Sequence, residues 1–349
     1  MLILYTTQVL KVGLLKDSDS QLLVHLPFFI EKAQLVANQT GRGFQEFSCG
    51  SKVFTLNVPL NSRPAEIMLG SFIPSDQGKS EATFVIIEEN DDVYRQILEL
   101  HDRHGDLLLR EIDKSSKYMA IDRSWNAIYF FDREHGIGGA CVSSLNGISL
   151  GAFITPIRTI VSWFLDIFST ELVHASAIGI NGTGVMISGA SGRGKSTTAL
   201  YAATHGHQIL GDDAVLVADG MVSALYKNAK FSLEDSRINL KGFNKVYLEP
   251  RSEKGILPLV DNNFDFIKSI PLDLLILPEI SNAPGFFELG KAAAVKEFVP
   301  QSMKEVLGGT QNNVQNLLKI VKETPCFRLF LSGDMETDFA NLLELVDRK

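Results

Sequence analysis

A short segment near the middle of the chain has residue types and spacing suited to holding phosphate. Residues 189–196 read Gly-Ala-Ser-Gly-Arg-Gly-Lys-Ser and fit the pattern G-x-x-x-x-G-K-[ST]. Glycines let a backbone curl so that several N–H groups point at a phosphate, and the N-terminus of a following helix adds its dipole. Lys195 would neutralise the β and γ phosphates, and the Ser196 hydroxyl would hold Mg²⁺. The predicted nucleotide-binding residues are Gly189, Ser191, Gly192, Arg193, Gly194, Lys195, Ser196 and Thr197.

Two adjacent aspartates, Asp212 and Asp213, close an apolar segment about one helix length beyond this loop. In a strand–loop–helix–strand unit they would lie beside the phosphates. Adjacent residues on a strand point to opposite faces, so we expect different roles for them. One would serve Mg²⁺ and the other would accept a hydrogen bond from an attacking hydroxyl. The alternative is a pair that only positions Mg²⁺ and water, as in an ATPase, whereas a chance glycine-rich turn would leave the aspartates unexplained.

His174 lies on a neighbouring strand-like segment. Its imidazole could pair with one of the two carboxylates and set the ionisation of that group. A histidine that follows an apolar Leu-Val is otherwise a hydrogen-bonded core residue. The residues alone leave both interpretations open.

The elements that must position these groups form an α/β pattern over residues 156–349. The predicted strands are 172–178, 185–187, 214–217, 221–226, 272–277 and 325–331, with a tight hairpin at 181–184. Helices are predicted from Pro156, after the loop, over 299–307 and 313–321, and at the C-terminus. The segment 227–251 is polar and basic, and we expect a solvated face there or a grip on a phosphoryl group or acidic substrate. Its cations are Lys227, Lys230, Arg237, Lys241, Lys245 and Arg251.

Residues 1–150 form a different pattern, that of a β-rich α+β domain. Strands are predicted at 2–5, 21–29, 52–58, 67–72, 82–87, 107–112, 118–121 and 127–131, and a helix at 91–101. His101, His104 and His135 lie near Asp102 and Glu134, but no spacing supports a metal site, and solvated loop histidines are the simpler interpretation. We expect this domain to serve substrate recognition or dimerisation, so a homo-oligomer is compatible with the sequence.

Length and composition bound the class of protein. A chain of 349 residues should hold two domains, because one core rarely grows past roughly 250–300 residues. The net charge of −8 argues against nucleic acid as a partner. Three widely spaced cysteines argue against a disulfide framework. No segment is long and apolar enough to span a bilayer, and the apolar N-terminus lacks the features of a signal peptide, so we expect a cytoplasmic protein.

The combination of these motifs resembles a known family. From His174 to Val217 the sequence is similar to the catalytic domain of HPr kinase/phosphorylase and its relatives. The shared pattern is a histidine at the end of a strand, a glycine-rich loop closing on Lys-Ser, Gly-His at the end of a helix, and two aspartates. Here Gly206-His207 supplies the third part. The resemblance implies a phosphoenolpyruvate-carboxykinase-like P-loop fold, ATP and Mg²⁺ as cofactors, and transfer of a phosphoryl group to a serine hydroxyl.

The resemblance also implies roles for the site residues. Asp212 would be the general base, and Asp213 would help to hold Mg²⁺ with Ser196 and would connect to His174. A positioned base contributes roughly 10²–10⁴ in rate, and the remainder comes from positioning and charge neutralisation. The catalytic candidates are therefore Asp212, Asp213, His174 and Lys195.

The chain departs from the bifunctional bacterial enzymes of this family, which leaves the acceptor open. The glycine- and isoleucine-rich signature after the aspartates and the basic C-terminal loop are not found, and the N-terminal half reads differently. Residues 222–230 instead resemble a segment of the HPr-kinase-like serine kinases of natural-product gene clusters, which include kinases of lasso-peptide precursors. We therefore expect a kinase of a serine on a peptide or protein. The alternatives are a kinase of a small hydroxyl metabolite, a nucleotide-binding regulator with little turnover, and carboxykinase chemistry, for which no second metal site is found.

Overall fold

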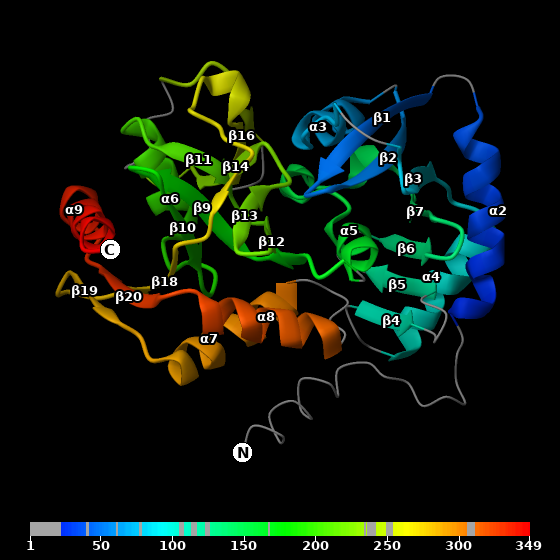
Figure 1. Ribbon diagram of the computed structural model, residues 1–349. Coiled ribbons are helices and arrows are strands. Elements are labelled where there is room, and N and C mark those ends of the chain that lie inside the picture. Colours follow the sequence, from blue (N-terminus) through cyan, green and yellow to red (C-terminus); the bar gives the residue numbers. More distant parts are fainter. Residues whose placement is uncertain are drawn as a thin grey trace. The chain divides into compact units, whose positions relative to one another are not determined.

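The computed structural model describes most of the chain, which divides into two compact units (Figure 1). One unit comprises 1–69, 74–149 and 157–164, and the other comprises 70–73, 150–156 and 165–349. The residues described are 22–39, 42–60, 62–76, 79–104, 108–112, 117–122, 126–166, 168–233, 235, 242–248, 254–305 and 311–349. The segment 157–164, which the sequence analysis placed with the catalytic half, belongs to the first unit.

The first unit is built on a seven-stranded mixed sheet in the order β1-β2-β3-β7-β6-β5-β4. The β2–β3 and β3–β7 pairs are parallel, and the other neighbours are antiparallel. The strands are β1 (Arg42–Cys49), β2 (Lys52–Pro59), β3 (Ala82–Glu88), β4 (Leu108–Ile112), β5 (Lys117–Asp122), β6 (Ala127–Asp132) and β7 (Ile137–Val142).

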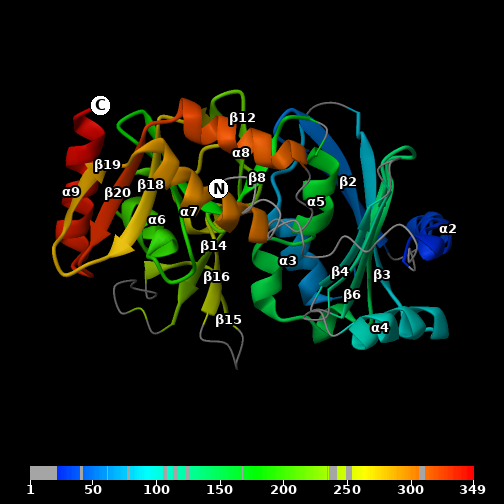
Figure 2. The same cartoon turned by 90° about the horizontal axis from the view of Figure 1, so that it is seen from below.

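Helices cover both faces of this sheet (Figure 2). η1 (Leu23–His25), α2 (Leu26–Ala37) and α4 (Asp92–His104) pack on one face, where Val85 and Phe130 point. On the opposite face, Trp163 of α5 (Arg158–Leu165) packs on the ring of Tyr118. Phe164 of the same helix packs on the rings of Phe84 and Phe131. Because neighbouring residues on a strand point to opposite faces, β6 is buried along its whole length.

Two strand predictions in this unit are wrong. The segment predicted as a strand at 21–29 forms η1 and the start of α2, because Leu26, Phe29 and Ala33 recur at helical spacing on the buried side. The segment predicted at 67–72 lies mostly within α3 (Arg63–Ser71). The predicted strands at 52–58, 82–87, 107–112, 118–121 and 127–131 and the helix at 91–101 are confirmed to within a few residues, and the segment 2–5 lies outside the described residues.

The second unit holds a six-stranded sheet in the order β11-β9-β10-β18-β20-β19, with β10, β18 and β20 parallel. The strands are β9 (Ala175–Ile180), β10 (Thr183–Ser188), β11 (Gln208–Gly211), β18 (Leu274–Ile280), β19 (Gly285–Glu288) and β20 (Cys326–Leu331). Ile187 faces the core beneath α6 (Lys195–Thr204) and α9 (Met335–Asp347). Met186 faces the core beneath α7 (Lys291–Glu305) and α8 (Gln311–Glu323).

Two smaller antiparallel sheets complete this unit. One has the order β17-β13-β12-β8 and the other the order β14-β16-β15. Their strands are β8 (Glu171–Val173), β12 (Val215–Ala218), β13 (Met221–Ala224), β14 (Asn228–Ser232), β15 (Tyr247–Leu248), β16 (Lys254–Pro258) and β17 (Ser269–Pro271). The predicted hairpin at 181–184 is confirmed, since Asn181 and Gly182 both have positive φ, of 50° and 80°, as a tight turn between β9 and β10 requires.

Two chain segments pass between the six-stranded sheet and the four-stranded sheet at the same place. The strand predicted at 172–178 is broken at His174, so that β8 pairs with β12 and β9 pairs with β11. The second segment is broken at Asp212 and Asp213, between β11 and β12. Because both pairings are antiparallel, the two breaks lie opposite each other. This crossing brings His174 to the aspartates.

A buried carboxylate anchors α8 to the four-stranded sheet. Glu171 of β8 accepts hydrogen bonds from Asn313 Nδ2 at 3.0 Å to each carboxylate oxygen and from Asn316 Nδ2 at 2.7 Å. Burial raises the pKa of Glu171 to about 7, the two amide donors oppose the rise, and the charge of Asp166 adds to it. The folded protein therefore holds a proton on Glu171 over a pH range where the unfolded chain releases it.

We predict that Glu171→Gln changes the pH dependence of stability. The raised pKa destabilises the native state as pH rises from 4.5 to about 7, by about 3 kcal/mol in total. In urea unfolding, the variant should be the more stable protein at pH 8, and its advantage should shrink toward pH 5. Glu323→Gln, at an exposed position on α8, is the matched control. An advantage that is the same at both pH values would contradict this assignment.

Candidate phosphate-binding and catalytic site

The glycine-rich loop joins β10 to α6, in the strand–loop–helix order that the sequence predicts. Gly189, Gly192 and Gly194 have φ of 147°, 80° and 89°, values that side chains other than glycine rarely adopt. A Cβ on Gly194 would also lie 2.6 Å from Leu331 Cδ1, at the carboxyl end of β20. The sequence places glycine where this backbone path requires it.

The side chains of the loop differ in exposure. Ser191, Gly192 and Arg193 are exposed, whereas Lys195 is buried. Lys195 Nζ donates to the carbonyl oxygens of Gly189 at 2.8 Å and Ala190 at 3.2 Å. The ammonium group is thus held over the loop itself, inside the curve of its backbone.

Asp212 is the most deeply buried of the predicted site residues, with no exposed surface. Its Oδ1 accepts a hydrogen bond from Ser176 Oγ at 2.5 Å, and its Oδ2 accepts one from the Lys230 main-chain N–H at 2.9 Å. The Ser196 side chain lies close enough to this carboxylate to help hold its pKa down. Burial, and then the charge of Asp213, raise the pKa of Asp212, while the three donors oppose the rise. Asp212 therefore connects the start of α6 to the neighbouring strands.

Asp213 faces different partners. Its φ of 68° is left-handed, which is uncommon for a residue other than glycine. This conformation brings its carbonyl oxygen to 2.8 Å from His174 Nδ1, and its carboxylate Oδ1 lies 3.6 Å from the same nitrogen. Lys230 Nζ lies 4.0 Å from the same Oδ1. Two basic side chains thus lie close to this carboxylate.

The structure thus brings together His174, Asp212, Asp213 and the start of α6. The sequence analysis expected Ser196 to share Mg²⁺ with Asp213, which stays a prediction, and the Ser196 side chain also lies near Asp212. Sequence reasoning missed Ser176, which lies two residues after His174. It also missed Asp235, whose Oδ2 accepts a hydrogen bond from Thr197 Oγ1 at 3.0 Å.

Part of the basic segment after the aspartates forms a largely buried strand and not a solvent-exposed face. Residues 228–232 form β14, and Asn228, Ala229 and Phe231 are buried. Lys230 lies among them and reaches both aspartates. Lys245 instead pairs with Asp261 at 2.7 Å. Arg237, Lys241 and Arg251 lie outside the described residues.

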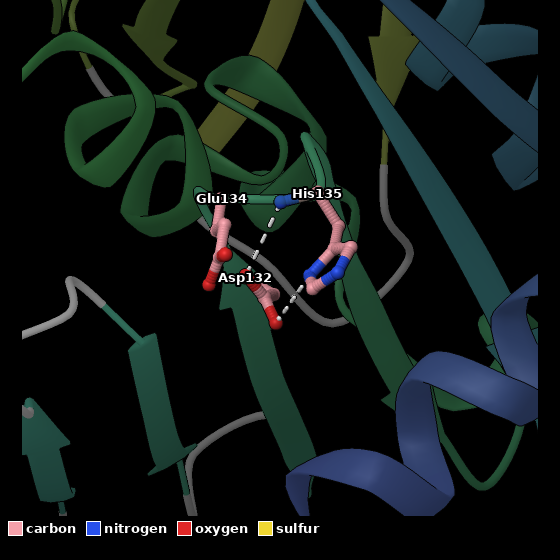
Figure 3. Close-up of side chains that lie close together, drawn as sticks. All are labelled: Asp132, Glu134 and His135. Carbon is pink, nitrogen blue, oxygen red and sulfur yellow. Dashed lines mark hydrogen bonds and ion pairs between the residues drawn. The ribbon is translucent and has the colours of Figure 1, made fainter.

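A second polar cluster belongs to the other unit. Figure 3 shows Asp132, Glu134 and His135, whose ligand-type atoms all lie within 4.8 Å of one another. His135 bonds to Asp132 through its main-chain N–H at 3.3 Å and its Nδ1 at 3.0 Å. These bonds close a local turn at the end of β6, which accounts for the cluster.

The residues at the glycine-rich loop fit a magnesium–nucleotide complex. Curled backbone with left-handed glycines at a helix N-terminus is suited to phosphate oxygens. Ser196, Asp212 and Asp213 offer hydroxyl and carboxylate oxygens, the ligands that Mg²⁺ prefers. Among the described residues, no helix is both long and apolar enough to cross a membrane.

Known proteins resemble the part of the chain that contains this site. Residues 166–243 match the family model of the HPr Serine kinase C-terminal domain. The chain is 32% identical over 120 residues to an HPr kinase/phosphorylase of Mycoplasmopsis pulmonis, covering 32% of this chain and 37% of that protein. It is 40% identical over 73 residues to an HPr kinase/phosphorylase of Chlorobium phaeobacteroides, covering 19% and 22%. The chain thus spans only 37% and 22% of the length of these two curated relatives.

A solved structure, the Hpr(Ser) kinase/phosphatase from Coxiella burnetii, is 14% identical and aligns with a TM-score of 0.29, covering 51% of this chain and 90% of the other. That likeness is too low to support an argument about the fold. The matched segment 166–243 contains the glycine-rich loop, His174 and both aspartates. The family model and the two curated relatives thus show that this part of the chain is similar to HPr kinase.

Proposed function

We propose that the chain is an ATP- and Mg²⁺-dependent kinase that transfers the γ-phosphoryl group to a serine hydroxyl of a peptide or protein. The observation that carries the proposal is the fully buried Asp212 carboxylate, which accepts hydrogen bonds from Ser176 and the Lys230 main-chain N–H, lies near Ser196 at the start of α6 and adjoins Asp213. A carboxylate this well buried, next to a phosphate-binding loop, is suited to take a proton from a hydroxyl. The names of the curated relatives, HPr kinase/phosphorylase, support the same reaction class.

In this proposal each side chain has one task. Asp212 accepts the proton of the serine hydroxyl as the new oxygen–phosphorus bond forms. The bond between the γ-phosphorus and the β–γ bridging oxygen breaks at the same time, and ADP leaves. Its raised pKa makes it a stronger base than a solvated aspartate. Lys195 moves from the loop carbonyls to the phosphates, and Ser196 and Asp213 hold Mg²⁺, which supplies charge neutralisation when bound. His174 fixes Asp213 through the bond to its main-chain oxygen.

The acceptor is the least constrained part of the proposal. A protein related to HPr is suggested by the names of the relatives, and the C-terminal serine of a lasso-peptide precursor by the resemblance of residues 222–230. We would incubate the protein with ATP and Mg²⁺ and with each of three acceptor sets: an HPr protein, serine-containing peptides, and free serine with common sugars. Intact mass spectrometry reads phosphate on a protein or peptide, and ADP release reads transfer to a metabolite. Release of ADP only with metabolites would replace the proposal with the small-molecule alternative.

We predict that Asp212→Asn lowers phosphoryl transfer by roughly 10²–10⁴-fold, because an amide cannot accept the proton. Affinity for ATP, measured by calorimetry, should change far less. Asp219→Asn is the matched control, since Asp219 lies in a turn with a φ of 49° that asparagine tolerates. If Asp212→Asn transfers phosphate at the wild-type rate, Asp212 is not the base.

We predict that Lys195→Met weakens ATP binding by roughly 10- to 100-fold, the loss expected for a charge-assisted hydrogen bond to phosphate. Removal of Mg²⁺ with a chelator should weaken ATP binding in the wild-type protein as well. The exposed Lys319→Met on α8 should behave as wild type. Unchanged affinity in Lys195→Met would remove the nucleotide from this loop.

A further inference from the structure

Lys230 contacts both aspartates of the site through two different groups. Its main-chain N–H donates to Asp212 Oδ2 at 2.9 Å, and its Nζ lies 4.0 Å from Asp213 Oδ1. The Asp212 carboxylate in turn lies near Ser196. Lys230 lies on β14, the strand that follows the aspartate pair and the β12–β13 hairpin in the chain. A single side chain, that of Asp212, lies between Lys230 and the start of α6.

The position of Lys230 on β14 is fixed by the residues beside it. Ala229 and Phe231 are buried in the core that also contains Ala199 and Leu200 of α6. Since successive residues of a strand point to opposite faces, Lys230 projects away from that core, to the side where Asp213 lies. The backbone is held, and the side chain is 30% exposed.

The ammonium group is attracted to Asp213 without being tied to it. A separation of 4.0 Å exceeds hydrogen-bond distance, whereas Lys32 lies 2.7 Å from Asp91 and Lys245 lies 2.7 Å from Asp261. A lysine side chain has several rotatable bonds, so a shift of one or two ångströms requires no movement of β14. The charge of Lys230 can therefore reach a second anion while it stays near Asp213.

The charge balance of the site calls for such a cation. Two carboxylates lie side by side at Asp212 and Asp213, and a triphosphate brings several more negative charges to the same place. The other described cations of the loop are Arg193, which is exposed, and Lys195, whose ammonium group donates to two loop carbonyls. We propose that Lys230 is a phosphate-binding residue, whose ammonium group contacts the terminal phosphate of a bound nucleoside triphosphate. This inference rests on the proposed function only in that the loop binds a nucleotide.

The test compares a triphosphate with a diphosphate. Lys230→Met should bind a non-hydrolysable ATP analogue with Mg²⁺ roughly 10- to 100-fold more weakly in calorimetry, and should bind ADP within about twofold of wild type. Lys230→Arg should recover most of the affinity for the analogue, because it keeps the charge. Lys254→Met, on the neighbouring strand β16, is the matched control and should leave both affinities unchanged. Equal weakening for both nucleotides, or none for either, would overturn the proposal.

A second measurement uses the wild-type protein and does not depend on how the variants fold. Lysines are acetylated at low reagent excess and read by peptide mass spectrometry, in the presence of the ATP analogue or of ADP. Lys230 should be protected by the analogue and not by ADP, while Lys254 reacts equally in both. Equal reactivity of Lys230 under the two conditions would overturn the contact.

These outcomes are separable from those of the proposed function. If no acceptor is phosphorylated and the triphosphate still binds more weakly to Lys230→Met, the phosphate contact stands and the kinase proposal fails. If an acceptor is phosphorylated and Lys230→Met discriminates the two nucleotides as wild type does, the contact fails and the kinase proposal stands.

Discussion

The site depends on one feature of chain topology, the coincidence of two breaks at which strands pass from one sheet to another. β8 and β9 are separated by His174, and β11 and β12 by Asp212 and Asp213. Antiparallel pairing of β9 with β11 and of β8 with β12 places these breaks opposite each other. Residues at a break are released from the ladder, so the Asp213 main-chain oxygen can accept a bond from the His174 imidazole. The glycine-rich loop leaves β10, the other neighbour of β9, and so reaches the same place.

The environments of the Asp212 and Asp213 carboxylates are set by burial and by hydrogen-bond donors that come from several elements. Asp212 has no contact with solvent and is compensated by Ser176, the Lys230 amide and Ser196. Burying a carboxylate without such donors would cost several kcal/mol. Asp213 keeps some exposure and lies between an imidazole and an ammonium group. Neighbouring residues of one type are thus placed in two electrostatic environments, an arrangement that allows a pair of carboxylates to have separate functions.

Local pattern predicted much of this arrangement from the sequence. Glycine spacing, the apolar run before it and the paired aspartates identified the loop and its flanking elements, since these signals lie within a few residues of one another. The segments predicted as strands at 21–29 and 67–72 are mostly helical. They were mispredicted because a short apolar run does not distinguish the periodicity of a helix from that of a strand. The break at His174 was not predicted, because it follows from pairing with β12, some forty residues later in the chain. Lys230 was seen only as part of a basic segment, and its contacts with the aspartates depend on the position of β14, which pairs with β16 in another sheet.

The left-handed backbone at Asp213 has a consequence for how this position can vary. A non-glycine residue with φ near 68° holds the chain in a conformation that is costly for most side chains, by roughly 1–3 kcal/mol. Glycine would relieve that strain but would remove the carboxylate beside His174 and Lys230. Asparagine would tolerate the backbone and lose the charge. Selection for a more stable fold would therefore favour another residue at position 213, whereas selection for a working site would keep the aspartate. In a descendant that lost its activity, we expect this position to be among the first to change.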